Sequence, residues 1–241
     1  MEKKRVTNTR PLPLPPRASK HSFAHSAVTD GRGGGGQQVH GVRTSQSTNV
    51  PRDAVVRCLE ARALAFQGLD TAAAQLEPLQ LVRYGRGERY HFHTDWFPDP
   101  ARATAALGGN RLSSFFAYVR ASNGTTAGSG PDGDDDSGGG GAGSDERVRG
   151  GGTNFPLVDA PRDPRWCDAW VDCDEPWDRG VTFRPVEGNA VYWENMLPDA
   201  PGRGDPRTLH AGLPLVSGEK IGLNIWTRQA PLGDDVRGPD V

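Results

Sequence analysis

The sequence predicts a mainly β fold of the sandwich or jelly-roll type with one flanking helix. Three observations support this class. Short apolar segments with a two-residue period recur along the chain, as in strands that bury one face. Glycine and proline, with 32 and 20 residues, separate these segments as turn formers. Only one convincing helical pattern precedes them, and short strands joined by turns are typical of a sandwich or jelly roll.

The helix is expected after Asn49 and Pro51, because proline is tolerated in the first turn of a helix. Its apolar face is predicted from residues at helical spacing, namely Val55, Leu59, Ala63 and Phe66. Gly68 is expected to end the helix. Cys58 lies within the pattern and is expected to be a small buried residue.

The strands are expected after this helix, where the apolar period changes to two. They are predicted at residues 79–84, 90–96, 112–119, 181–186, 190–194, 208–211 and 221–228. The segment 112–119 is apolar enough to be a central strand.

The chain is expected to contain one domain, at residues 41–230. Residues 1–40 are rich in Pro and Gly and hold few large apolar side chains, so disorder is expected there. Residues 121–152 are dominated by Gly, Ser and Asp and interrupt two strand-like segments. They indicate a low-complexity loop inserted into the domain. Residues 231–241 are expected to be a flexible tail.

Composition argues against several classes of partner. The chain has 28 Lys and Arg against 30 Asp and Glu, a net charge of −2, so no nucleic-acid partner is expected. It has no apolar run long enough to span a bilayer, and its first residues lack the apolar stretch of a signal peptide. Cys167 and Cys173 are close in sequence, but spacing alone leaves open whether they form a disulfide. No further cysteine pair is present to complete a zinc site.

The segment from Tyr90 to Asp95 is the best candidate for a metal site. Residues two apart share one face of a strand, so His93 and Asp95 can converge on one point. A second imidazole would complete the two-His-one-carboxylate set that binds Fe(II) and leaves positions open. His210 is the credible distal ligand, since the other histidines outside this segment lie in or beside the segment expected to be disordered.

Two alternatives accompany this hypothesis. His91 shares the predicted face with His93 and Asp95, and we prefer His93 because the His-x-Asp spacing is the tighter chelating arrangement. Taken alone, a His-x-Asp triplet is more often an ordinary hydrogen-bonded pair on a half-buried strand.

The flanking sequence changes that balance, because it resembles the prolyl 4-hydroxylase family. The resemblance lies first in residues 83–97, where Tyr84, Tyr90, His93 and Asp95 match the iron-binding strand of that family. It continues in order through 110–112 (Asn-Arg-Leu), 151–156 (Gly-Gly-Thr-Asn-Phe-Pro), 188–193 (Gly-Asn-Ala-Val-Tyr-Trp), 209–220 and Trp226. Together these motifs cover roughly residues 41–229, and their order is more specific than any one of them.

The resemblance implies a double-stranded β-helix, or jelly roll, with Fe(II) held by His93, Asp95 and His210 as the catalytic ligands. It implies that Lys220, ten residues after His210, pairs with the far carboxylate of 2-oxoglutarate. Tyr84 and Thr153 match cosubstrate positions. Positions near the substrate are matched by Tyr90, Arg111 and Trp226. For each of these residues the alternative is ordinary packing, and for Lys220 it is a surface position on a strand.

The implied activity is hydroxylation of a peptidyl proline at C4, in a Pro-containing peptide or protein. It consumes 2-oxoglutarate and dioxygen, uses ascorbate as reductant, and releases succinate and carbon dioxide. One alternative is the same chemistry on another residue or a small molecule. Another is an inactive, peptide-binding homologue. Relatives often work in the endoplasmic reticulum.

The sequence departs from the family pattern at several places. Gly152 stands where the family has Glu, and Asn189 stands where it has an acidic residue. Relatives carry strands and a long helix before the segment that matches Arg43-Thr44-Ser45, and here the preceding region is short and Gly-rich.

Overall fold

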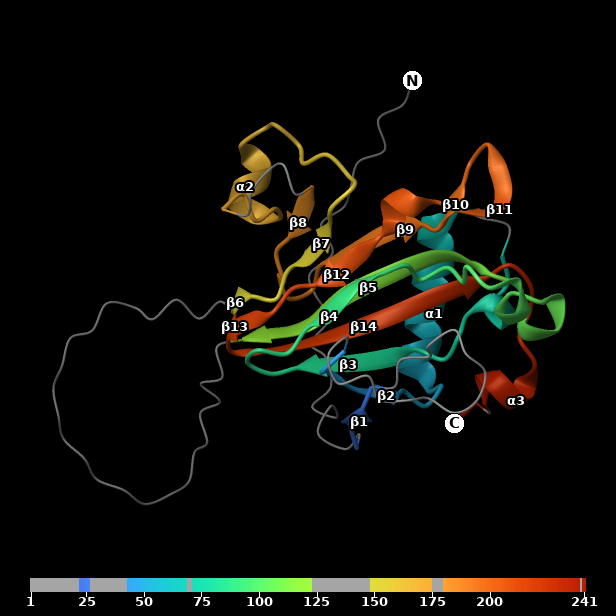
Figure 1. The fold of residues 1–241 in the computed structure, drawn as a ribbon. Coiled ribbons are helices and arrows are strands. Elements are labelled where there is room, and N and C mark those ends of the chain that lie inside the picture. The colour runs from blue at the N-terminus through green and yellow to red at the C-terminus, as the bar shows by residue number, and fades with distance from the viewer. Residues whose placement is uncertain (1–21, 27–42, 69–70, 123–147, 175–179, 239) are drawn as a thin grey trace, which may run out of the picture.

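The chain folds around two antiparallel sheets. The computed structural model describes residues 22–26, 43–68, 71–122, 148–174, 180–238 and 240–241. The larger sheet runs in the order β1 (Ala24–His25), β2 (Gln46–Asn49), β3 (Gln80–Tyr84), β14 (Glu219–Arg228), β5 (Arg111–Ser122) and β9 (Ala190–Glu194). The smaller sheet runs β4 (Tyr90–His93), β12 (His210–Gly212), β7 (Thr153–Phe155) and β8 (Val181–Phe183) (Figure 1). The predicted jelly-roll class is confirmed.

Two short strand pairs and three α-helices complete the described elements. The pairs are β6 (Arg149–Gly150) with β13 (Leu215–Ser217) and β10 (Met196–Leu197) with β11 (Ala200–Gly204). The helices are α1 (Ala54–Gln67), α2 (Arg165–Ala169) and α3 (Asp234–Arg237). Single 3₁₀ turns lie at Ala73–Gln75, Pro100–Arg102, Ala105–Leu107 and Pro206–Thr208. Within the described residues, no helix combines the length and apolar character needed to cross a membrane.

Helix α1 begins later than predicted. The side chain of Asp53 caps it by accepting hydrogen bonds from the backbone N–H of Val55 and Val56, both at 2.9 Å. Asn49 and Pro51 therefore precede the helix. Gly68 ends it in the left-handed conformation, at φ 62°, as predicted.

The apolar face of α1 was only partly predicted. Val56 and Ala63 are buried against the larger sheet, whereas Val55 and Phe66 are 42% and 68% exposed. Cys58 is exposed, so the prediction that it is buried is wrong. Ala63 and the partly buried Leu59 pack on the sheet as predicted, and Val56 takes the place expected for Val55.

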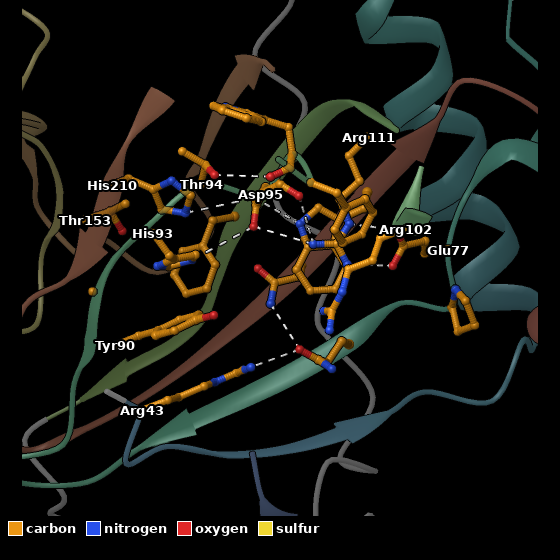
Figure 2. A pocket seen from close by; sticks show the side chains of 18 of the residues that line it. Arg43, Glu77, Tyr90, His93, Thr94, Asp95, Arg102, Arg111, Thr153 and His210 are labelled. Atoms are coloured by element: carbon orange, nitrogen blue, oxygen red, sulfur yellow. Dashed lines mark hydrogen bonds and ion pairs between the residues drawn. The ribbon is translucent and has the colours of Figure 1, made fainter. Parts of the chain in front are cut away.

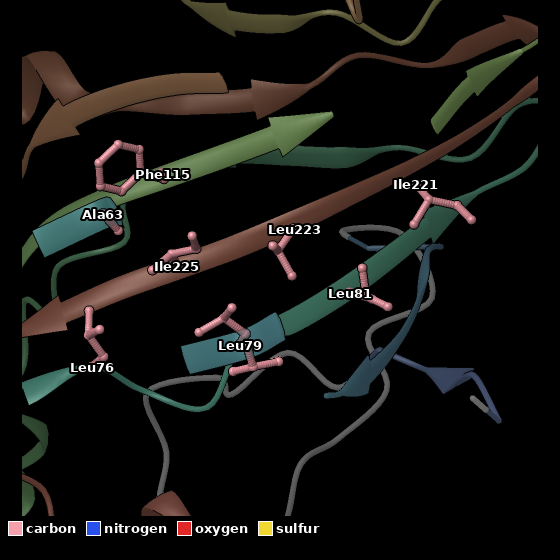
Figure 3. Packing of buried hydrophobic residues seen from close by; sticks show 9 residues of the cluster. Ala63, Leu76, Leu79, Leu81, Phe115, Ile221, Leu223 and Ile225 are labelled. Carbon is pink, nitrogen blue, oxygen red and sulfur yellow. The ribbon is translucent and has the colours of Figure 1, made fainter. Parts of the chain in front are cut away.

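The larger sheet separates two cores. Its outer face packs on α1 through a cluster that includes Leu81, Phe115, Ile221, Leu223 and Ile225 (Figure 3). Its inner face packs on the smaller sheet through Val82, Tyr84, Phe116, Tyr118, Phe155, Val181 and Trp193. Neighbouring residues of β3 and β5 belong to opposite cores, as the two-residue period requires. Each fully buried Leu or Phe contributes roughly 2 kcal/mol by leaving water.

Strand β14 places several residues on the inner face of the sheet. Ile221, Leu223 and Ile225 point outward, so Lys220, Asn224 and Trp226 share the inner face. Gly222, also on that face, has Phe116 directly against it. A Cβ there would lie 2.1 Å from the Phe116 ring, so only glycine fits this position.

Several segments expected to be disordered contain defined structure. Ala24–His25 form β1, which pairs with β2, and the hydroxyls of Ser26 and Ser45 lie 3.2 Å apart. At the two ends of the predicted insertion, β5 continues to Ser122 and Arg149–Gly150 pair with β13. Residues 123–147, 1–21 and 27–42 lie outside the described residues. The predicted tail contains α3.

Cys167 and Cys173 form a disulfide, which sequence spacing left open. The bond closes a short loop, from α2 to the segment that carries the buried Val171. Closing a loop with a sequence separation of 6 stabilises the folded chain by about 2 kcal/mol on the chain-entropy account.

We expect Cys167→Ser to lower the free energy of unfolding by about that amount. Urea unfolding under non-reducing conditions measures it. Cys58→Ser is the matched control, because Cys58 is exposed and unbonded. Equal midpoints for the two variants would show that the disulfide does not stabilise the fold.

Candidate metal centre and the cleft around it

His93, Asp95 and His210 converge between neighbouring strands of the smaller sheet. His93 ends β4 and His210 begins β12, and the two residues pair directly in the register of these strands. The potential ligand atoms of the three side chains all lie within 4.8 Å of one another. Nε2 of His93 lies 3.9 Å from Oδ1 of Asp95, and Nε2 of His210 lies 3.9 Å from Oδ2 (Figure 2).

Asp95 reaches this point from a bend and not from a strand. β4 ends at His93, so the predicted strand over residues 90–96 is too long. The bend is held by Thr94, whose hydroxyl donates to the carbonyl of Trp96 at 3.1 Å. His93 and Asp95 converge as predicted. The reason differs, because Asp95 lies in the bend after β4 and does not share a strand face with His93.

Both imidazoles are oriented by backbone carbonyls. Nδ1 of His93 lies 2.8 Å from the carbonyl oxygen of His91, and Nδ1 of His210 lies 2.8 Å from that of Thr208. With Nδ1–H donating to these oxygens, each Nε2 keeps its lone pair facing Asp95, as in metal-ligating histidines. The exposed ring of His91 is not part of the group, and only its carbonyl contributes.

The protonation states also suit metal binding. Burial, together with the neighbouring His210, lowers the pKa of His93 to about 3, so its imidazole is neutral. Burial alone would raise the pKa of Asp95. The neighbouring His210, Arg111 and His93 and a hydrogen bond from Ser114 outweigh it, and lower this pKa to about 2. The group therefore offers neutral nitrogen and anionic oxygen donors at neutral pH.

The Asp95 carboxylate is held in place by two donors. Its Oδ2 accepts a hydrogen bond from the hydroxyl of Ser114 at 2.7 Å and from the indole N–H of Trp226 at 3.0 Å. Asn195 donates in turn to Ser114 at 2.9 Å. Trp226 was predicted to line a substrate pocket, and here it also orients a ligand. Sequence reasoning missed Ser114, a polar residue within β5, and Asn195, which lies between β9 and β10.

These donors fit Fe(II). Two imidazoles and one carboxylate form the facial set that non-haem iron oxygenases use, with the remaining positions free for other ligands. The three side chains line a cleft of about 560 Å³, together with Tyr84, Tyr90, Arg111, Thr153 and Trp226. All eight of these residues were predicted site residues. Lys220 is the one predicted site residue that does not line the cleft.

Lys220 lies just behind the cleft and is fully buried. Its Nζ donates to the carbonyl oxygen of Gly151 at 2.5 Å and sits 4.3 Å from the centre of the Tyr84 ring. Within the described part of the chain, no carboxylate lies within ion-pair distance of it. Burial lowers the pKa of this ammonium to about 7. A buried ammonium without an anion fits a site that receives a carboxylate from a ligand.

Tyr84 and Thr153 line the cleft beside Lys220. Burial raises the pKa of Tyr84 to about 12, so its hydroxyl stays neutral and can donate a hydrogen bond. The hydroxyls of Thr153 and Tyr118 lie 2.7 Å apart. Gly152, where the resembling family has Glu, has no room for a side chain, because a Cβ would lie 2.6 Å from the Thr182 methyl group.

Charged and aromatic groups also line the cleft. Arg111 forms a bidentate ion pair with Glu77, at 2.7 and 2.8 Å, and its guanidinium lies 3.7 Å from the centre of the Trp226 ring. Tyr90 stacks on His93 with ring centres 3.6 Å apart, and Arg43 lies 4.6 Å from the centre of the Tyr90 ring. Figure 2 shows Arg43, Glu77, Tyr90 and Arg111 around the metal ligands.

Arg43 and Glu77 were missed as site residues. They lie outside regular strands, in segments with no apolar period to anchor a prediction. Only the fold brings Glu77 to Arg111 and Arg43 to Tyr90. The ion pair with Glu77 gives the largely enclosed guanidinium of Arg111 an acidic partner.

Comparisons with known proteins agree with this geometry. Residues 79–228 match the sequence profile described as the 2OG-Fe(II) oxygenase superfamily. Prolyl 4-hydroxylase 2 of Arabidopsis thaliana is 30% identical over 210 residues, which cover 86% of this chain and 60% of that protein. Prolyl 4-hydroxylase subunit alpha-2 of Gallus gallus is 29% identical over 210 residues, covering 86% and 30%. The chain thus spans about 60% of the length of the Arabidopsis relative.

A solved structure has the same fold. The viral collagen prolyl hydroxylase of Paramecium Bursaria Chlorella virus-1, in complex with 2OG, superposes with a TM-score of 0.52 at 22% identity. The match covers 79% of this chain and 81% of that chain.

Proposed function

The chain belongs to the 2OG-Fe(II) oxygenase superfamily, and from that premise we propose that it hydroxylates peptidyl proline at C4. The observation that carries the proposal is a cleft lined by His93, Asp95 and His210, with the buried Lys220 packed behind its Tyr84 wall. Among the described residues, this lysine has no carboxylate partner. Prolyl 4-hydroxylases among its relatives favour proline as the target.

Separate groups of residues would bind the metal, the cosubstrate and the substrate. Bound Fe(II) would couple the oxidative decarboxylation of 2-oxoglutarate, to succinate and carbon dioxide, with insertion of one oxygen atom of O₂ into a C–H bond. His93, Asp95 and His210 would hold the metal on one face. Ser114 and Trp226 fix the Asp95 carboxylate, so its orientation does not depend on the ligand.

Lys220 would pair with the far carboxylate of 2-oxoglutarate, giving up its bond to the Gly151 carbonyl. The pair would form in a site closed to water by Tyr84 and Phe116, where a charge-assisted hydrogen bond is strong. Tyr84 and Thr153 would supply hydroxyl donors beside it. Ascorbate would serve as the external reductant.

Tyr90, Arg111 and Trp226 would position the substrate on the metal side of the cleft. The stack of Arg43, Tyr90 and His93 offers a flat aromatic wall against which a proline ring can pack. A polypeptide substrate is favoured over a small molecule, because charged and polar groups continue along the cleft through Asp99 and Arg102. The complete metal set argues against an inactive homologue.

The test is succinate release by the whole chain with Fe(II), 2-oxoglutarate, ascorbate and a panel of Pro-containing peptides. We expect iron-dependent release that peptide stimulates, and mass spectrometry is expected to find one added oxygen on proline. Hydroxylation of another residue or of a small molecule would replace the proline assignment and leave the iron chemistry intact. Absence of both peptide turnover and uncoupled decarboxylation would refute the activity.

A further inference from the structure

The C-terminal segment, residues 230–241, is fastened to the domain at several points. The backbone N–H of Ala230 donates to Gly108 at 2.9 Å, and that of Leu232 donates to Ala74 at 2.8 Å. Leu232 is buried, and its side chain lies directly against Gly108. The backbone N–H of Val241 donates to the carbonyl of Arg52 at 3.2 Å. This segment is therefore built into the fold.

An ion-pair cluster on α1 holds α3 within this segment. Glu60 is 3% exposed and lies 2.8 Å from Arg52 and 3.7 Å from Arg237 of α3. Arg52 also pairs with Asp240. A buried carboxylate must keep its cationic partners, since an unpaired buried charge is costly. The cluster consequently fixes α3 relative to α1.

Held in this way, α3 contributes one side chain to the cleft. Val236 lines it, as the only described residue after Trp226 that does so. Val236 is 48% exposed, and it is the one apolar residue of α3, whose other three residues are charged. When a ligand covers an apolar side chain at the edge of a binding cleft, the removal of that surface from water makes binding more favourable.

We propose that Val236 forms an apolar subsite for a side chain that flanks the target proline, and so determines which peptides are preferred. This inference rests on the proposed function. The subsite is continuous with the cleft that holds the metal ligands, and its occupant is an apolar residue of the peptide substrate. α3 and the Glu60 cluster act as positioning elements that hold Val236 at the rim.

The experiment compares Val236→Asp with the unaltered chain on Pro-containing peptides that carry either Leu or Lys beside the proline. Val241→Asp is the matched control, because Val241 is 68% exposed on the same segment and does not line the cleft. Loss of one small apolar contact changes discrimination by about tenfold. We expect the Leu-to-Lys preference in kcat/KM to fall by about that factor in Val236→Asp and to be unchanged in Val241→Asp.

Binding of the same fluorescently labelled peptides, followed by anisotropy with 2-oxoglutarate and Mn(II) in place of Fe(II), gives a readout that needs no turnover. The same shift in preference is expected there. Unchanged preference in Val236→Asp would overturn the inference, even with an active enzyme. So would a loss of uncoupled decarboxylation in Val236→Asp alone, since that would show a structural role. If the unaltered chain binds peptides with the expected preference but hydroxylates none, the subsite stands and the proposed activity fails.

Discussion

His210→Ala is expected to abolish iron-dependent turnover. The side chain supplies one of three metal-binding groups, and its Nε2 already faces Asp95 because Nδ1 is held by the Thr208 carbonyl. Loss of an outer partner of a ligand typically weakens metal binding by about 10- to 100-fold, so loss of the ligand itself is expected to cost more than about 100-fold. Anaerobic Fe(II) titration and succinate release both measure the effect.

Two further variants separate ligation from folding. The buried ring of His210 packs against Phe155 and Trp193, so alanine also leaves a cavity. His210→Gln keeps most of the volume and is expected to lose iron binding while unfolding near the temperature of the unaltered chain. His91→Ala removes an exposed imidazole from the same strand as His93, and is expected to keep full activity. Turnover that survives in both His210 variants would refute the ligand assignment.

Lys220→Met is expected to raise the KM for 2-oxoglutarate by about 100-fold, the equivalent of losing a strong charge-assisted contact of roughly 3 kcal/mol. Iron affinity should stay unchanged, because Lys220 does not belong to the metal group. Methionine has similar length and no charge, so the inner core is preserved. Tyr84→Phe is the companion variant, since it keeps the ring beneath Nζ and removes only the hydroxyl.

The same residue predicts a pH dependence with a defined sign. In the ligand-free chain, burial lowers the pKa of Lys220 from 10.5 to about 7. Between these two values the unfolded chain binds the proton and the folded chain does not, so this group makes stability rise with pH across that window. Affinity for 2-oxoglutarate should fall over the same range, because the free ammonium is lost.

Urea unfolding and 2-oxoglutarate binding, each measured from about pH 6 to pH 10, test how stability and affinity change with pH. Lys220→Met should remove the rise in stability that the buried ammonium causes. Identical pH profiles for the variant and the unaltered chain would show that Lys220 does not titrate as described.

Sequence reasoning succeeded where one residue's neighbours in sequence determine its environment. The two-residue period found the strands that carry His93 and His210. It also found the strand that carries Lys220, although it predicted the start at Ile221 and not at Glu219. The ordered motifs supplied the metal group. Such signals are local or are spaced regularly, so a single sequence contains them.

It failed where the fold joins segments that are distant in the chain. Glu77 meets Arg111 across 34 positions, and Ser114 meets Asp95 across 19. The start of α1 is set by the Asp53 side chain, which accepts hydrogen bonds from the first backbone N–H groups of the helix. Sequence alone does not show which residue makes these bonds. α3 has only four residues and is held by the ion pair between its Arg237 and Glu60 of α1, so its own sequence does not predict a helix.

The register of β14 has a consequence for how the chain can vary during evolution. Lys220 and Trp226 lie on one face of this strand and serve the cosubstrate and the metal-binding carboxylate separately. Their six-residue separation spans roughly 20 Å at the rise of a strand. Inserting or deleting a single residue between them would turn one of them to the opposite face of the sheet. Natural length variation should therefore avoid residues 220–226, while substitutions on the outer face that keep apolar volume are tolerated.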